Sequence, residues 1–177
     1  MHDLNSNPPL DNARYNKYIS DVPSKLQKEL KQTRPFACKE EEVHLNIIRT
    51  AEWLSSAFSE TLKSADLTPT QYNALRILRG AGTEGLSCSQ ISERMVTKDS
   101  DITRLLDRLE ARGLISRERE SKDRRVIITR ITEGGLRTLA ELDKPIQEHH
   151  RRLLKHMGEK ELASLNTLLE QARQHAD

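Results

Sequence analysis

Aromatic side chains are scarce in this chain. They make up 3% of its 177 residues, and apolar residues of all kinds reach 35%, whereas 32% of positions are charged. Such a composition provides little material for a large self-contained core, and this length corresponds to one domain or to one domain with an extension. Leucines nevertheless recur at helical spacing. We therefore expect long helices whose remaining apolar stripe is buried by a second copy of the chain, which makes the protein a homodimer.

Cysteine is equally sparse. The only two cysteines, Cys38 and Cys88, are distant in the sequence and form no CxxC pair, so neither a disulfide framework nor a zinc ribbon is indicated. No apolar run approaches the length of a membrane span, and the N-terminus lacks the basic-then-apolar pattern of a secretion signal. These absences predict a cytoplasmic protein that has no membrane partner.

Signatures of catalysis and of bound cofactors are missing as well. The sequence contains no glycine-rich phosphate loop, no nucleophile elbow and no pair of carboxylates at catalytic spacing. Two of the six histidines, His149 and His156, share one face of a predicted helix, but no cysteine or carboxylate is spaced to complete a metal site. We therefore predict no enzymatic activity, no metal and no cofactor, and interpret these histidines as exposed polar residues.

The formal net charge of +2 is too small to indicate a nucleic-acid partner by itself, so the placement of charge matters more than its total. Residues 86–132 hold eleven basic and eight acidic side chains, a modest excess. The sharper concentration is local, because Lys122, Arg124 and Arg125 surround the single acidic residue Asp123.

The N-terminal part of the chain divides at about residue 38. Residues 1–38 are rich in Asn, Pro and Asp, which predicts a poorly ordered extension that could contain a short helix at 23–33. From about residue 40 to residue 64, apolar positions recur at three- and four-residue steps. That period predicts one long amphipathic helix.

Two further helices begin with the same local signal. Thr68 and Gln71 have the spacing of a capping box, and Pro69 between them suits the first helical position. Ser87 and Gln90 repeat the capping-box spacing, so a third helix begins there and ends near residue 96.

The fourth helix, at about residues 99–112, has two contrasting faces. Its apolar residues recur at i, i+3, i+4 and i+7 and predict a buried face: Ile102, Leu105, Leu106 and Leu109. The side chains expected to contact DNA lie on or beside the opposite face: Ser100, Thr103, Arg104 and Arg108. In an isolated helix, arginines more often belong to a solvent-exposed face, where they form surface ion pairs such as one between Asp101 and Arg104. Here the preceding helix and the elements that follow favour a helix-turn-helix.

A basic hairpin follows this helix. Gly113 predicts a left-handed stop, after which residues 114–120 and 126–131 have the composition of two strands. The hairpin tip is polar and basic and carries the remaining predicted DNA contacts: Lys122, Asp123, Arg124 and Arg125. An arginine at such a tip can enter the narrow minor groove, and Asp123 is placed to hold Arg125 extended.

The C-terminal part is predicted to be helical again. Thr132 caps a long helix that runs to about residue 157, with a kink or a break at Pro145, and Gly158 separates it from a last helix. We therefore expect a mainly α fold with a small β-wing. In it, a winged helix-turn-helix domain at 67–132 lies between the two parts of a helical dimerisation module, 39–66 and 133–177.

The segment from Leu67 to Thr132 resembles the MarR (multiple antibiotic resistance regulator) family of bacterial transcription regulators. The matching segments are LTPTQY at 67–72, ITRLLDRLE at 102–110, RGL at 112–114, DRR at 123–125 and ITEGG at 131–135. With the flanking helices included, the resemblance extends over about residues 40–175.

The resemblance implies a homodimer that binds double-stranded DNA at a pseudo-palindromic operator. Recognition helices would occupy successive major grooves, with Arg125 as the wing arginine and Asp123 as its orienting carboxylate. It further implies a sequence-specific regulator of transcription, a repressor relieved by a small-molecule effector. Two alternatives remain: a regulator that senses oxidants through Cys38 or Cys88, and a winged-helix protein-interaction module that does not bind DNA.

Overall fold

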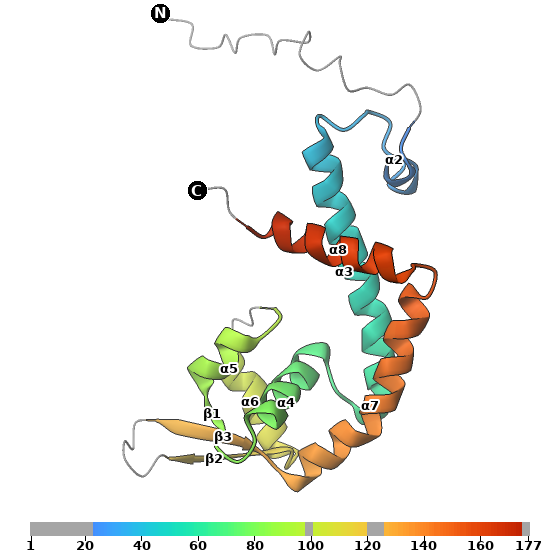
Figure 1. Cartoon of the computed structure of the whole chain (residues 1–177). Coiled ribbons are helices and arrows are strands. Elements are labelled where there is room, and N and C mark those ends of the chain that lie inside the picture. Colours follow the sequence, from blue (N-terminus) through green and yellow to red (C-terminus); the bar gives the residue numbers. More distant parts are fainter. Residues whose placement is uncertain (1–22, 98–100, 120–125, 175–177) are drawn as a thin grey trace, which may run out of the picture. The chain divides into compact units, whose positions relative to one another are not determined.

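A computed structural model of the chain describes residues 23–97, 101–119 and 126–174 (Figure 1). The chain forms two compact units, residues 1–53 and 54–177. Its elements, in order, are α2 (Lys25–Glu29), α3 (Lys39–Leu62), the 3-10 turn η1 (Lys63–Ala65), α4 (Pro69–Ala81), β1 (Leu86–Ser87), α5 (Cys88–Arg94), α6 (Ile102–Ala111), β2 (Ile115–Arg119), β3 (Ile127–Ile131), α7 (Glu133–Leu154) and α8 (Glu159–Ala172). The expected mainly α fold with a small wing is confirmed. Within the described ranges, no helix combines the length and the apolar character that crossing a bilayer requires.

The first unit contains α2 and most of α3. Ser24 caps α2 by accepting a hydrogen bond from the backbone N–H of Gln27, and the helix ends before Lys31, whose φ is 52°. The helix predicted at 23–33 is therefore confirmed but shorter. An ion pair of 2.9 Å joins Arg49 on α3 to Glu29 on α2. Residues 1–22 of the predicted extension lie outside the described residues.

The two capping boxes predicted at the starts of α4 and α5 are confirmed. Thr68 accepts from the backbone N–H of Gln71, whose side-chain oxygen accepts in return from the Thr68 N–H. Ser87 and Gln90 exchange the same pair of hydrogen bonds at the start of α5. Each box satisfies two backbone donors that have no partner within the helix.

The wing contains one strand more than predicted. The three strands lie in the order β1-β3-β2, all antiparallel, with Ile115 opposite Ile131 and Leu86 opposite Thr129. Gly85 has φ 69°, and a Cβ there would lie 2.6 Å from the Thr129 carbonyl oxygen, so only glycine lets β1 approach β3 this closely. A two-residue strand is too short to show an alternating pattern, which explains why β1 was not predicted.

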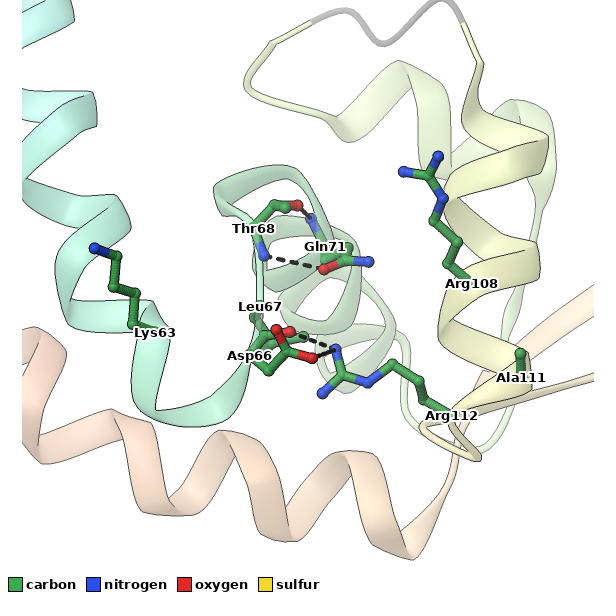
Figure 2. A pocket seen from close by; sticks show the side chains of 8 residues that line it. All are labelled: Lys63, Asp66, Leu67, Thr68, Gln71, Arg108, Ala111 and Arg112. Atoms are coloured by element: carbon green, nitrogen blue, oxygen red, sulfur yellow. Dashed lines mark hydrogen bonds and ion pairs between the residues drawn. The ribbon is translucent and has the colours of Figure 1, made fainter.

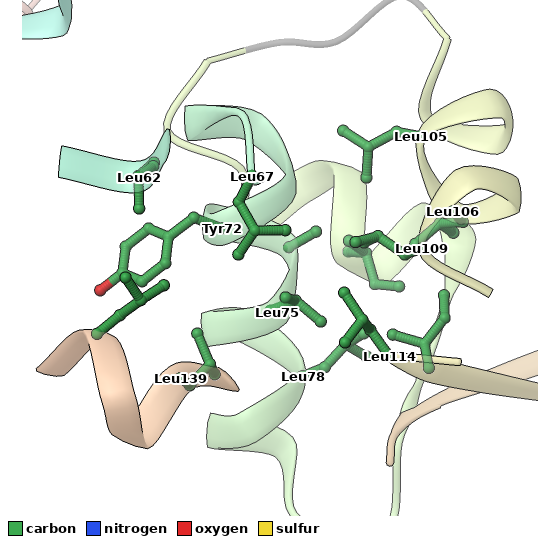
Figure 3. Packing of buried hydrophobic residues seen from close by; sticks show 14 of the residues in the cluster. Leu62, Leu67, Tyr72, Leu75, Leu78, Leu105, Leu106, Leu109, Leu114 and Leu139 are labelled. Carbon is green, nitrogen blue, oxygen red and sulfur yellow. The ribbon is translucent and has the colours of Figure 1, made fainter. Parts of the chain in front are cut away.

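The core of the second unit is built mainly from leucines (Figure 3). Its fully buried large side chains come from the end of α3, from α4 to α6, from β3 and from α7: Leu62, Leu75, Leu78, Ile91, Leu106, Leu109, Thr129 and Leu139. Three of the four apolar residues predicted for the inner face of α6 are buried, and Ile102 packs against them half-buried. α6 is thus fixed with its other face to solvent.

The long helix α7 passes through Pro145 without a break. Proline removes one backbone hydrogen bond, but Leu142 and Ile146 on either side of it are both buried in the core. This packing holds the helix together, so the predicted alternative of a break is wrong. Thr132 caps the helix as predicted, accepting from the backbone N–H of Gly135, and Gly158 is the N-cap residue of α8.

The interpretation of His149 as an exposed residue is wrong, because its side chain is only 3% exposed. Its Nδ1 lies 2.7 Å from Thr61 Oγ1 on α3, and its ring lies beside Phe58 with centroids 5.8 Å apart. Its Nε2 is buried without a hydrogen-bond partner among the described residues. Burial lowers the pKa of His149, and the positive charges that His150 and Arg152 can carry lower it further.

This lowered pKa predicts a loss of stability in acid. The unfolded chain binds the proton of His149 more readily, so the stability is fully present above the ordinary histidine pKa and is lost as the pH falls below it. Between about pH 7.5 and about pH 5, the thermal midpoint of the parent protein should fall further than that of His149→Gln. The exposed His156 supplies the control, since His156→Gln should keep the pH dependence of the parent. An equal fall in His149→Gln would show that other groups cause the acid sensitivity.

Candidate nucleic-acid interface

The exposed face of α6 presents three of the side chains predicted to contact DNA. Thr103, Arg104 and Arg108 are all exposed, on the side of the helix away from the buried leucines. The structure therefore brings together the described members of the predicted site. The other predicted members lie outside the described residues: Ser100, Lys122, Asp123, Arg124 and Arg125.

The start of α6 is organised by Asp101. Its Oδ1 accepts a hydrogen bond of 3.2 Å from the backbone N–H of Arg104, and its Oδ2 lies 3.5 Å from Arg104 Nε. One carboxylate thus caps the helix and orients an exposed arginine. Ion pairs this exposed stabilise little, so Arg104 remains free to exchange Asp101 for another anion.

The turn before α6 is tied back to α4. The backbone N–H of Val96, just after α5, donates to Asn73 Oδ1 at 2.9 Å. Asn73 is half-buried on α4 and is therefore held in place by the core around it. This bond sets where the chain leaves α5, the first helix of the helix-turn-helix.

Arg117 on β2 joins the flank of α6 to the wing through hydrogen bonds. Arg117 was not among the residues predicted from the sequence. The Nε atom of Arg117 donates to Glu110 Oε2 at 2.9 Å, and its NH2 group donates to Asp107 Oδ1 at 2.6 Å. Glu110 and then Asp107 raise the pKa of the guanidinium by accepting these bonds, although partial burial opposes the rise. Asp107 and Glu110 of α6 are thus both paired with an arginine of the wing.

Arg117 faces two acidic side chains of α6, Asp107 and Glu110. Arg117 compensates the negative charge of both carboxylates of α6 from the side of the wing. The available sequence signal was the i, i+3 spacing of Asp107 and Glu110, which places them on one side of the helix. Which strand residue would face them depends on how the hairpin folds back.

The end of α6 is also fixed. The backbone N–H of Leu114 donates to the Leu109 carbonyl at 3.0 Å and that of Gly113 to the Glu110 carbonyl at 2.8 Å, with φ 67° at Gly113. This is the predicted Schellman stop. Arg112 donates to the carbonyls of Ala65 and Asp66, which joins the end of α6 to the corner between α3 and α4.

The described residues give no support to a metal site, since they contain no group of three or more histidine, cysteine or acidic side chains placed to hold an ion. Cys38 is exposed, whereas Cys88 is half-buried and packs against the core. The redox alternative therefore stays an untested prediction.

The comparisons with known proteins agree on one family. The model of the MarR family matches residues 67–127. A solved MarR transcription factor from Planctomyces limnophilus is 36% identical, and the match covers 77% of this chain and 98% of that one with a TM-score of 0.60. A MarR mutant from E. coli, solved with operator DNA, is 22% identical with a TM-score of 0.70, covering 85% of this chain and all of that one. The transcriptional repressor MdtR of Bacillus subtilis is 34% identical over 53% of this chain and 59% of its own length.

Arg117 should contribute measurably to stability. Arg117→Met leaves two acidic side chains one turn apart without their cation, and we expect a loss of about 1–2 kcal/mol in the free energy of unfolding, measured by urea denaturation. Arg119 is the matched control, because it lies two residues further along the same strand and is exposed. Arg119→Met should be close to neutral. If both variants unfold at the same urea concentration as the parent, the Arg117 contacts add nothing to stability.

Proposed function

Because this chain belongs to the MarR family of transcription regulators, we propose that it binds a specific double-stranded DNA operator through the exposed face of α6. The observation that carries this proposal is the arrangement of α6. Its leucines are buried, its Thr103, Arg104 and Arg108 are exposed, and side-chain contacts hold it at its start, flank and end. A helix held in this way can enter a major groove without first being ordered, so little entropy is lost on binding.

Each exposed side chain of α6 has a chemically suitable counterpart on DNA. Arg104 can donate two parallel hydrogen bonds to a guanine edge or can bind a phosphate. The methyl group of Thr103 suits the methyl group of thymine, and Arg108, one turn further along, is placed for the backbone. In the same proposal Ser100, which precedes α6 by two residues in the sequence, approaches the groove closely. The wing residues Lys122, Arg124 and Arg125 bind the flanking backbone and minor groove, with Asp123 orienting Arg125.

We further propose that the protein acts as a homodimer. On α3, four large apolar side chains are between 39% and 54% exposed: Val43, Ile47, Ile48 and Trp53. On α8, Leu165 and Leu168 are 36% and 61% exposed, and no residue of this helix is buried. Helices with apolar stripes that the chain does not cover itself are expected to bury them against another chain. Two copies related by a two-fold axis would read the two halves of a pseudo-palindromic operator.

In this proposal the protein represses transcription by occupying the operator. It acts in the cytoplasm, and it acts by binding alone, without a catalytic step. The similarity to the repressor MdtR supports repression. Relief by a small-molecule effector belongs to the same proposal.

The role of Arg104 can be tested on DNA selected from a random pool. The selected site should be two-fold symmetric, and Arg104→Ala should weaken binding by about 1–3 kcal/mol and relax the preference at one base pair of each half-site. Arg151→Ala removes another exposed arginine, on α7, and should leave the sequence preference unchanged. Failure of the parent protein to enrich any sequence would overturn the proposed function and revive the protein-interaction alternative.

The dimer can be tested with Leu168→Glu. The change places a charge in the exposed apolar stripe of α8, where it removes nothing from the described core, and a stable dimer should then shift towards monomer in light scattering at about micromolar concentration. Asn166→Glu adds the same charge to another exposed position of the same helix and should keep the mass of the parent. A monomeric parent protein, or a Leu168→Glu variant that dimerises as tightly as the parent, would contradict the proposed interface.

A further inference from the structure

A groove lies beside α6, between its second half and the corner that joins α3 to α4 (Figure 2). It has a volume of about 500 Å³, and its lining residues come from η1, from the corner after it, from the start of α4 and from α6: Lys63, Asp66, Leu67, Thr68, Gln71, Arg108, Ala111 and Arg112. All of them belong to the second unit. In Figure 2, Lys63 and Arg108 stand on opposite sides of the groove and Arg112 extends from the end of α6 towards Asp66.

The lining is strongly positive. It contains three cations and a single carboxylate, that of Asp66. Asp66 does little to neutralise them, because its side chain is 97% exposed and its carboxylate lies 3.9 Å from Arg112 NH1. Arg112 is already engaged with the two backbone carbonyls of the corner, so it contributes charge and rigidity more than free donors. Lys63 and Arg108 supply the donors that a ligand could use.

Both of these cations can turn to a ligand at little cost. Lys63 pairs with Glu60 at 2.6 Å, but both side chains are about two-thirds exposed, and exposed pairs of this kind stabilise very little. Arg108 is exposed, and among the described residues it has no ion-pair partner within 4.0 Å. An anion that enters the groove therefore displaces no strong contact.

The groove continues the exposed stripe of α6. Arg104, Arg108 and Arg112 follow one another at intervals of four residues, so each lies about one turn beyond the last along the same side of the helix. Arg104 and Arg108 are the side chains already proposed to meet DNA. A DNA strand that leaves Arg108 and follows this stripe would pass next over the groove and then reach Lys63.

We propose that this groove is a second contact with the DNA backbone, in which Lys63 and Arg108 bind phosphates of one strand and Arg112 adds its positive charge. The inference rests on the proposed function, because it presumes that α6 faces DNA. A polyanion suits the groove better than a single small anion, since the two available cations, Lys63 and Arg108, stand on opposite sides of it. Phosphate contacts of this kind add affinity and position the protein, but they read no sequence.

The first test removes the charge of Lys63. Lys63→Gln should weaken binding to the selected operator and to unrelated DNA by the same factor, about fivefold at about 0.1 M salt, and lower the slope of log affinity against log salt by about one. Lys144→Gln is the matched control, because Lys144 on α7 is likewise an exposed lysine that pairs with a nearby exposed glutamate, Glu148. It should change the slope far less. Equal slopes for the parent and Lys63→Gln would overturn the inference while leaving the proposed function intact.

The second test looks for a gain of affinity, which structural damage does not produce. Asp66 has φ 51°, and Asn tolerates this left-handed conformation well, so Asp66→Asn should fold normally. Without the only carboxylate of the groove, operator binding should tighten by about the factor lost in Lys63→Gln. Unchanged or weaker binding of a folded Asp66→Asn variant would contradict the backbone contact.

A small anion is the competing occupant, and benzoate is its probe. At constant ionic strength set with chloride, benzoate should inhibit DNA binding no more than chloride does, equally in the parent and in Lys63→Gln. Saturable inhibition that disappears in Lys63→Gln would assign the groove to a small anionic effector and overturn the backbone assignment. If the parent protein binds no DNA at all, the proposed function itself fails. This result differs from saturable inhibition by benzoate, which would overturn only the assignment of the groove.

Discussion

The burial of the leucines on α6 is the constraint on which the rest of the site depends. Leu106 and Leu109 are at most 1% exposed and pack in one cluster with Leu75 and Leu78 of α4. Each such side chain contributes about 1.5–3 kcal/mol by leaving water, so rolling the helix about its axis would be costly. The roll angle is therefore fixed, and with it the direction in which Thr103, Arg104 and Arg108 point.

Apolar burial alone would still let the helix slide or tilt, because the hydrophobic effect has no direction. Directional contacts remove this freedom. Asp101 caps the start, Arg117 holds the flank against β2, and Arg112 ties the end to the corner after η1. These contacts involve mostly exposed groups and are individually weak, yet they act at three separated points of one short helix. Rigidity of the reading surface is thus distributed over several contacts.

Much of this arrangement was predictable because it depends on the spacing of residues that are close together in the sequence. The capping boxes at Thr68 and Ser87 and the stop at Gly113 each involve residues within a few positions of one another, and all three are confirmed. The inward and outward faces of α6 follow from the helical period in the same way. Their prediction needed no knowledge of which other elements pack against them.

The remaining features depend on residues far apart in the chain. Strand β1 forms only because β3 pairs with it. The two carbonyl oxygens that accept hydrogen bonds from Arg112 belong to residues 46 and 47 positions earlier in the chain. His149 is buried because Thr61 and Phe58 of α3 lie against it, and the spacing of residues within α7 gives no sign of these contacts.

The sequence by itself thus determined the helices, the capped starts of α4, α5 and α7, and the side of α6 that faces solvent, since these follow from contacts within one or two turns. Only the tertiary structure decided which cation compensates the carboxylates of α6, which histidine is buried, and that Lys63 and Arg108 line one groove. The reason is physical: a charge acts on whatever lies within a few ångströms of it, and distance in space is set by packing.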